Sequence, residues 1–562
     1  MKRLFRPLPK PSAFHLLPLA LTLACGAVDS AFAQTATAAG TATNAAVSPL
    51  KLRGITFVNM EDASAPRVPH EGIDLAQVPV LDTPEVRSQL RSLLDGPLSQ
   101  ESLIGLIGIA NARFAAVGQS FTVASIPQQD VSNGLLLVEV RRARVGNVAV
   151  KRAGAQAFPE EHYRNLLRLR PGDLLVRDTL DEEADWISRA NPYRSASVVT
   201  QPGQVPGTTD LELVVTDRRP YAFSAGYDNS GTRVTGRDRL NFSAGWGNVF
   251  GLDQQLNYSL SVSPDFHDSV AHTLGYVVPL PWRHLLSVTA SHSTLHGRMP
   301  APFDLNGGAQ GVSVRYDVPL KTHDGFKHGF YGSFDYKRSD NNLLFSAMPV
   351  NNTLTDIYQV GLGYSFTLRD KYGSTSVGLN WFHSPGSVGG VNNDGAFNAA
   401  RAGAKSRYNY QTLTVERLTR LPADWSWTIN GRYQRSDGNL LGSEQLAGGG
   451  VSSVRGFADP VVYGDEGFVI RNELAAPALP LGDKGGFGAL QGILFYDAAR
   501  LWSHTLLPGE QSAYNLSSWG VGVRANFARN VALRADFGKQ LKMDVPGANP
   551  DNIAHVSINI SF

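Results

Sequence analysis

The chain has 562 residues, 42% of them hydrophobic, and its 51 Lys and Arg residues nearly balance 49 Asp and Glu residues, for a formal net charge of +2. The first 33 residues hold four of the basic residues and one acidic residue, so the chain without them carries a charge of about −1. A nucleic-acid-binding protein needs a concentrated basic face, so we expect no nucleic-acid partner.

The first 33 residues have the pattern of a secretory signal peptide. A basic start is followed by a long apolar run and then by the small residues of "SAFAQ". Ala31 and Ala33 fit the A-x-A pattern that precedes signal cleavage, so we expect cleavage between Ala33 and Gln34. The protein is therefore expected to be exported.

The only cysteine of the chain, Cys25, lies within this leader. A lipoprotein signal ending at Cys25 is the alternative, but Thr22 occupies the place where a leucine is usual. Without the leader the chain has neither disulfides nor thiolate metal ligands. No run of 18 or more apolar residues follows, so we expect no membrane-spanning helix.

Residues 34–50 are small and polar, which indicates a flexible linker. They show no amphipathic stripe, so a plug helix is not expected there. Two mixed units follow, residues 51–142 and residues 143–217, each with the order β-α-α-β-β and each of a size that suits one small domain.

The helix signals of the first unit are clear. Thr83 is a helix N-cap with Pro84 at the first helical position, and Gly96 suits the end of this helix. A second helical period begins at Ser99, and two apolar strands follow it. The second unit repeats this order less cleanly.

Residues 218–562 alternate apolar or aromatic side chains with polar ones in segments of about ten residues. This alternation is typical of a transmembrane β-barrel, and roughly 21 residues per strand and connection predict about sixteen antiparallel strands. The chain ends at Phe562 after alternating Val556, Ile558 and Ile560, which resembles the C-terminal signal read by the outer-membrane barrel-assembly machinery. A soluble β-sandwich or propeller is the alternative, and export argues against it.

The stretch "SEQLAGGGVSSVRGF" lies in a long connection, about residues 437–465, between the predicted eleventh and twelfth strands. It ends on the tetrapeptide Val454, Arg455, Gly456 and Phe457. An outward loop would leave its arginine in solvent. If the loop folds inward, Gly456 permits the turn, Phe457 packs against the wall, and the preceding three glycines form a hinge.

A later strand, "QGILFYDAARLW", supplies a partner for this arginine. Phe495 and Asp497 lie on one face of that strand, so Asp497 is expected to point into the lumen. A carboxylate in a confined lumen favours a cation, and arginine donates a bidentate pair of hydrogen bonds. We therefore expect Arg455 to reach Asp497.

These two stretches resemble the signature motifs of the TpsB transporters of two-partner secretion, the ShlB/FhaC/HecB-type haemolysin secretion/activation proteins. "VASIPQQDVSNGLLLVEV" resembles the end of their first POTRA (polypeptide-transport-associated) domain, and "LLRLRPGD" and "ANPYR" resemble parts of the second. The resemblance covers nearly all of the mature chain. Ala499 departs from the family, where the strand motif usually has glycine.

The resemblance implies an α+β region of two periplasmic POTRA domains followed by an all-β barrel of about sixteen antiparallel strands in the outer membrane of a Gram-negative bacterium. It implies an inward loop held by an Arg455–Asp497 contact. It also implies that a monomer, placed in the lipid bilayer by the barrel-assembly machinery, captures an unfolded TpsA-type exoprotein and secretes it without ATP. The Arg455–Asp497 pair is then either a latch or only a support for barrel assembly.

Other functions fit the residues less well. A passive porin has no use for two β-α-α-β-β units, whereas an outer-membrane insertase of the same superfamily shares them and remains the alternative. An enzyme is not expected, because the chain has no G-x-S-x-G or H-E-x-x-H motif. The 13 histidines are scattered, so neither a metal site nor a cofactor is expected.

Overall fold

The computed structural model describes residues 50–562 apart from a set of short segments. These segments are 62–67, 206, 323–324, 346–347, 483–487, 507, 509–510, 529 and 546–551. The predicted signal peptide, its cleavage site between Ala33 and Gln34, and the predicted linker up to residue 49 lie outside the described residues. Among the helices of the described part, none has both the length and the apolar character needed to cross a membrane.

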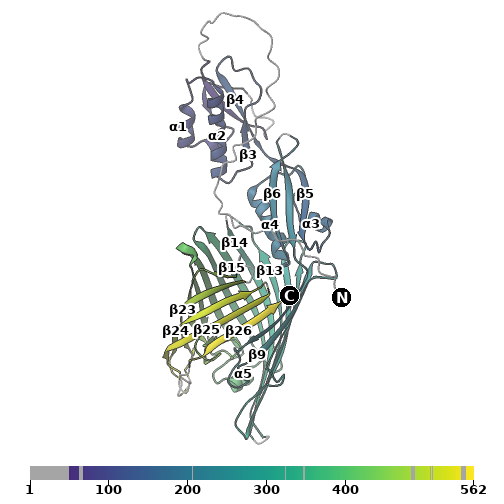
Figure 1. Ribbon diagram of the computed structural model, residues 1–562, viewed down its shortest axis with the longest axis vertical. Helices are drawn as coiled ribbons and strands as arrows, with labels where there is room; N and C mark the ends of the chain where they lie inside the picture. Colours follow the sequence, from purple (N-terminus) through teal and green to yellow (C-terminus); the bar gives the residue numbers. More distant parts are fainter. Residues whose placement is uncertain are drawn as a thin grey trace, which may run out of the picture. The chain divides into compact units, whose positions relative to one another are not determined.

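The first unit has the predicted β-α-α-β-β order and one additional short strand, β2, which pairs in parallel with β1. Two helices and the four-stranded sheet, in the order β2-β1-β4-β3, enclose one apolar core (Figure 1). Its elements are β1 (Gly54–Asn59), β2 (Gly72–Asp74), η1 (Pro79–Leu81), α1 (Pro84–Arg91), α2 (Gln100–Ala116), β3 (Thr122–Ser125) and β4 (Leu135–Arg142).

The predicted helix starts of this unit are confirmed. The Thr83 side chain accepts a hydrogen bond from the Val86 backbone N–H, with Pro84 in the first helical turn. Ser99 and Ser102 cap α2 reciprocally. Both caps orient their helices so that apolar side chains such as Leu90 are buried against the sheet.

The second unit also has the predicted order, with a three-stranded sheet arranged β5-β7-β6. Its core contains the fully buried Tyr163 and Ile187. Its elements are β5 (Arg144–Gly154), α3 (Glu160–Leu166), α4 (Arg177–Ala190), β6 (Arg194–Pro202) and β7 (Thr208–Asp217).

The described residues after the second unit form a closed antiparallel barrel of sixteen strands, as predicted. β8 pairs with both β9 and β26, which closes the sheet, and β22 continues β21 along β23. The strands are β8 (Tyr221–Asp228), β9 (Arg239–Val249), β10 (Gln254–Val262), β11 (Ser269–Pro279), β12 (Leu285–Gly297), β13 (Phe303–Pro319), β14 (Phe326–Phe345), β15 (Met348–Asp370), β16 (Gly373–Pro385), β17 (Arg407–Arg420), β18 (Ser426–Ser436), β21 (Glu466–Ala475) with β22 (Leu479–Leu481), β23 (Gly488–Trp502), β24 (Tyr514–Phe527), β25 (Val531–Met543) and β26 (Ala554–Ser561).

Some connections carry small elements of their own. A seven-residue helix, α5, lies in the connection between β16 and β17 (Figure 1). A short ribbon of β19 and β20 lies between β18 and β21. These elements are α5 (Asp394–Ala400), η2 (Pro422–Asp424), β19 (Leu446–Gly448) and β20 (Val462–Gly464).

Two features of the barrel were not predicted. No strand was expected at β13, although Val312, Val314, Tyr316 and Val318 alternate along its second half; Gly307, Gly308 and Gly311 interrupt the pattern only before them. Strands β14 and β15 have 20 and 23 residues, about twice the 9–11 residues that span a bilayer. These two strands therefore extend beyond the membrane.

The second unit contacts one rim of the barrel, which we call the inner rim; the opposite rim is the outer rim. Arg194 of β6 donates two hydrogen bonds to Asp253 in the β9–β10 turn, at 2.8 and 2.9 Å. Arg283 of the β11–β12 turn donates to Glu183 at 2.6 Å. Burial alone would raise the pKa of Asp253, but its contacts with His162 and Arg194 outweigh burial and hold this pKa below its usual value.

Candidate functional site

The connection between β18 and β21, residues 437–465, folds back into the barrel. The β19–β20 ribbon joins its two ends, and its tip carries the tetrapeptide that begins at Val454. Val454, Arg455 and Phe457 are at most 1% exposed. The tip contacts β21, β23, β25 and β26 through the hydrogen bonds and packing described below.

Arg455 and Asp497 form a fully buried ion pair. Arg455 donates from Nε to Asp497 Oδ2 at 2.7 Å and from Nη2 to Oδ1 at 2.9 Å, and its backbone N–H donates to Oδ2 at 3.2 Å. Arg455 Nη1 donates to Glu473 Oε2 at 2.7 Å, and its Cζ lies 3.7 Å from the centre of the Phe495 ring. The bidentate geometry fixes the direction of the guanidinium as well as its charge.

The strand β23 directs Asp497 inward by simple alternation. Phe495 and Asp497 are buried, whereas Leu494 and Tyr496 are 48% and 47% exposed on the outer, lipid-facing side. Successive side chains of a strand point to opposite faces, so the apolar residues that face lipid oblige Asp497 to face the lumen.

Gly456 brings the loop backbone into contact with the barrel wall. Its φ is +88°, and a Cβ atom there would lie 2.6 Å from the carbonyl oxygen of Gly538 in β25. Its N–H donates to His555 Nε2 at 3.2 Å, and its carbonyl accepts from Gln540 Nε2 at 2.8 Å. Only glycine fits both the left-handed backbone and this close approach.

Phe457 packs into an apolar cluster between the loop and the wall. The cluster excludes water from the inner side of the Arg455–Asp497 pair, which strengthens the electrostatic interaction between them. Its buried members are Leu446, Val454, Phe457, Val462, Val469, Ala499, Leu501 and Leu516.

The three glycines before the tip are tightly packed. Gly449 and Gly450 have φ values of +99° and +88°, and a Cβ at Gly449 would lie 2.6 Å from the Ala458 carbonyl oxygen. These glycines allow a tight turn of the backbone where other atoms lie very close. From the sequence alone they indicated only a flexible hinge.

Charged side chains from four strands surround the tip. Asp536 of β25 accepts from Arg524 Nη1 at 2.6 Å and from Arg534 Nε at 2.7 Å, and it lies 3.8 Å from Arg455 Nη1. The tip cluster comprises the arginines Arg455, Arg471, Arg524 and Arg534 and the carboxylates Glu473, Asp497 and Asp536. Arginines exceed carboxylates by one.

A cavity of about 580 Å³ with a mixed polar and apolar lining lies beside the loop. Ser452 and Ser453 of the loop line one side, and lumen-facing residues such as Thr414, Glu416 and Arg471 line the other. No three His, Cys, Asp or Glu side chains in the described ranges are placed to hold a metal ion.

Comparisons with known proteins identify the fold and the family. A family model for the haemolysin secretion/activation proteins ShlB/FhaC/HecB matches residues 207–525. The chain belongs to this family. It is 25% identical to the outer membrane transporter CdiB of Dickeya dadantii (strain 3937) over 410 residues, which cover 71% of this chain and 70% of that protein. It is 26% identical to the hemolysin transporter protein ShlB of Serratia marcescens over 319 residues, 54% and 55% of the two chains.

The solved structures agree with this assignment at the level of the fold. CdiB from Escherichia coli aligns with a TM-score of 0.73 at 19% sequence identity, covering 93% of both chains. As a member of the ShlB/FhaC/HecB family the chain is an outer-membrane transporter of two-partner secretion. The chain is located in the outer membrane. With its two N-terminal units on the periplasmic side, as expected from the sequence, the inner rim is the periplasmic one and the outer rim the extracellular one.

A second set of contacts holds the base of the loop at the outer rim. Asp465 is fully buried and accepts hydrogen bonds from Arg401 Nη1 and Nη2 at 2.5 and 2.9 Å. It also accepts from the N–H groups of Leu440 and His504, at 2.8 and 3.0 Å. Glu444, the glutamate of "SEQ", accepts from Lys337 Nζ at 2.7 Å. These contacts, which we call the base anchor, tie the loop to three neighbouring outer segments.

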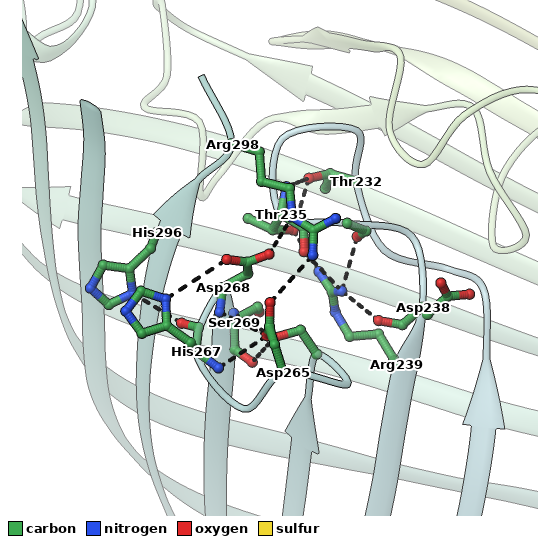
Figure 2. A network of polar contacts seen from close by, with 12 residues as sticks. Thr232, Thr235, Asp238, Arg239, Asp265, His267, Asp268, Ser269, His296 and Arg298 are labelled. Atoms are coloured by element: carbon green, nitrogen blue, oxygen red, sulfur yellow. Dashed lines mark hydrogen bonds and ion pairs between the residues drawn. The ribbon is translucent and has the colours of Figure 1, made fainter. Parts of the chain in front are cut away.

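Another outer network joins the first three outward connections of the transporter (Figure 2). Arg298, after β12, pairs with Asp268 and, at 3.3 Å, with Asp265 in the β10–β11 connection. Its backbone N–H donates to Val234 in the β8–β9 connection at 2.7 Å. The rings of His267 and His296 stack at 4.2 Å. This network holds the outer ends of the strands next to the β8–β26 seam.

The C-terminal Phe562 extends the pairing of β26 with β8. Its N–H donates to the Phe223 carbonyl at 2.9 Å, and its own carbonyl accepts from the Phe223 N–H at 3.3 Å. The side chain is 75% exposed, at the periplasmic edge of the lipid-facing surface.

Sequence reasoning missed several members of the site. Glu473 and Asp536 complete the tip cluster, and Arg401 and Asp465 form the base anchor. Alternation places Glu473 and Asp536 on lumen-facing positions, as it does Asp497, so a search for inward carboxylates would have found them. No sequence signal points to Arg401.

Proposed function

We propose that the chain captures an unfolded exoprotein with its POTRA domains and passes it through the barrel lumen without ATP, after the tip of the 437–465 loop moves aside. The observation that carries this proposal is the buried Arg455–Asp497 pair, which holds a non-strand segment inside the lumen. The tip is not a strand of the barrel, so its ion pairs, hydrogen bonds and packing can be released without breaking the strand ladders. We assign the pair the role of a latch.

Capture fits the edges of the two small sheets. The order β5-β7-β6 leaves β6 as an edge strand, and Val199 on it is 42% exposed. An extended polypeptide can add to such an edge through main-chain hydrogen bonds, which demand little of its sequence. The other edge strand, β5, is partly covered at its start by a bridge between Arg144 and Leu174. We therefore assign capture to β6.

Passage fits the polar part of the lining of the cavity beside the loop. Hydroxyl and amide groups, such as those of Ser376 and Asn430, offer an unfolded chain weak and replaceable contacts. The chain has no phosphate-binding loop, so the free energy of passage comes from folding of the exoprotein outside the cell. The partner expected from this function is a TpsA-type exoprotein.

An insertase of the same superfamily is the alternative. That function requires the barrel to open sideways, and the β8–β26 seam is the place for it. This ladder pairs Ser224–Asp228 with Ser557–Ser561 and is extended by one residue at each end, at Phe223–Phe562 and Asn229–Val556, whereas β24 and β25 pair along most of their greater length. A short ladder costs less to open, so the seam is the observation in favour of this reading.

The test is secretion of a large exoprotein by cells that carry Arg455→Ala, with the compact, heat-modifiable barrel measured in the same outer membranes. We expect a normal amount of barrel and a loss of secretion. Arg298→Ala is the matched control, because it also removes an arginine from a carboxylate network but leaves the loop untouched. A loss of the barrel from the outer membrane would mean that Arg455 is needed only for barrel assembly. Unchanged secretion would refute the role of the Arg455–Asp497 pair as a latch. Depletion of unrelated outer-membrane barrels would favour the insertase.

A further inference from the structure

Arg471 occupies an unusual place beside the latch. It lies on β21 directly opposite Asp497 of β23 in the antiparallel register. Side chains at such paired positions share one face of the sheet, with Cβ atoms roughly 4.5–5.5 Å apart. Arg471 therefore faces the lumen from the position nearest to Asp497 on the neighbouring strand.

Despite this position, Arg471 forms neither a hydrogen bond nor an ion pair within 4 Å among the described residues, and its Nε is buried. Its interaction with Asp497 and Glu473 is limited to attraction at longer range. Both oxygens of Asp497 are already occupied by Arg455. The tip cluster has one more arginine than carboxylates, and Arg471 is the arginine without a carboxylate at ion-pair distance. A buried, unpaired donor is unfavourable, so its presence calls for an explanation.

The loop supplies that explanation, because Arg455 belongs to the segment that moves and Arg471 belongs to the wall. When the tip leaves, Asp497 loses all three hydrogen bonds from Arg455 and remains buried on its strand. A buried carboxylate without a cation strongly disfavours that state. The cavity of about 580 Å³ beside Arg471 gives its guanidinium room to turn.

We propose that Arg471 is a reserve partner that pairs with Asp497 when Arg455 withdraws with the loop tip. The proposal rests on the proposed function, in which the tip moves. Asp497 then has a cationic partner in both states of the loop. The partner is Arg455 when the tip is docked and Arg471 when the tip has moved. This exchange of partners lowers the free-energy barrier to undocking of the loop tip, while the Arg455–Asp497 pair still holds the docked tip.

The test is a mutant cycle read on barrel stability, as the temperature at which the purified full-length barrel loses its compact migration. Arg471→Gln alone leaves this temperature unchanged or slightly raised, because in the docked state Arg471 forms no hydrogen bond or close ion pair, and its repulsion by Arg455 and Arg534 offsets its attraction to Asp497 and Glu473. In the Arg455→Ala background the same change lowers it by roughly 5 °C or more, because Asp497 is then unpaired. Adding Asp497→Asn to that background abolishes the effect.

Arg432→Gln is the matched control. Arg432 lines the same cavity from β18 but stands opposite Val469, so its removal changes lumen charge without affecting Asp497. A simple repulsion between Arg471 and Arg455 would give no effect of Arg471→Gln once Arg455 is absent, and this outcome refutes the proposal. Complete loss of the barrel in Arg455→Ala also refutes it, because a reserve partner would have kept Asp497 paired. Secretion is not measured here, so failure of the proposed function is seen separately.

Discussion

Replacing Gly456 with alanine tests whether close fit, in addition to charge, holds the loop tip. The added Cβ would lie 2.6 Å from the Gly538 carbonyl oxygen. Such overpacking costs about 1–3 kcal/mol. The left-handed φ of +88° costs any residue with a Cβ about 1 kcal/mol more. Together they destabilise the docked tip by about 2–4 kcal/mol, which lowers the ratio of docked to undocked loop by about 30- to 700-fold.

A single cysteine at Ser453 reports the undocked fraction. Ser453 is 5% exposed and lines the cavity, and the sole natural cysteine, Cys25, lies in the predicted leader. We expect a membrane-impermeant maleimide to react with Ser453→Cys only when the tip has moved. Gly456→Ala should raise the labelling rate by the factor above, until reaction of a fully exposed thiol becomes limiting.

The same contact can be tested from the wall. Gly538→Ala places a Cβ 2.8 Å from the Arg455 carbonyl oxygen and should raise labelling without straining the loop backbone. Gly442→Ala, in the same loop, and Gly492→Ala, on β23, are the matched controls, since nothing lies within 4 Å of a Cβ at either position. Labelling of the Gly456→Ala and Gly538→Ala chains within about twofold of these controls would refute the close-fit reasoning.

Two further predictions concern the ends of the transport path. Arg194→Ala removes the charged partner of the buried Asp253 and should weaken the junction of the second POTRA-type unit by about 3–5 kcal/mol, seen as faster proteolysis between Asp217 and Tyr221. In the unaltered chain the same proteolysis should stay slow at neutral pH and accelerate only in acid. The pKa of Asp253 is lowered in the folded protein, so the stability that its ionised form gives the junction is lost only as the pH falls through that pKa. Acceleration near neutral pH would contradict the Arg194–Asp253 contact as the source of this stability. Asp465→Ala leaves the largely buried Arg401 unpaired and should make the α5 connection sensitive to protease added outside cells, whereas Gly438→Ala, with open space around it, should not.

The predictable part of this structure is the part that repeats along the chain. Alternation of side chains reveals lipid-facing and lumen-facing positions in nearly every strand, and helix caps at Thr83 and Ser99 mark the first unit. β13 shows this alternation only in its second half, at Val312, Val314 and Tyr316. In its first half glycines take several positions, so the strand conformation there depends on pairing with the neighbouring strands β12 and β14.

The sequence predicted site residues only where a single charged residue stands within a clear local pattern, such as a glycine-rich loop or an alternating strand. Arg455 and Asp497 are two such residues. Asp536 and Arg471 enter the tip cluster through the register of strands far apart in the chain, and that register is set by closure of the barrel. Arg401 binds Asp465, which follows it by 64 residues in the sequence. Arg401 lies in an irregular connection, where no periodic pattern of side chains indicates its direction.

The two anchors of the loop differ in a way that defines its motion. At the base, Asp465 receives five hydrogen bonds, from Arg401 and His504 in outer segments and from Leu440 and Gln445 within the loop itself, and no second carboxylate within the described contacts offers Arg401 a comparable pair. At the tip, the proposed exchange lets Arg471 replace Arg455 on Asp497. On that proposal the tip is the end that moves, and the base is its pivot. About nine residues separate Leu446 from Arg455, and an extended chain spans at most about 3.3 Å per residue, so the tip can sweep about 30 Å from a fixed base. That reach lets the loop clear the lumen without releasing its outer anchor.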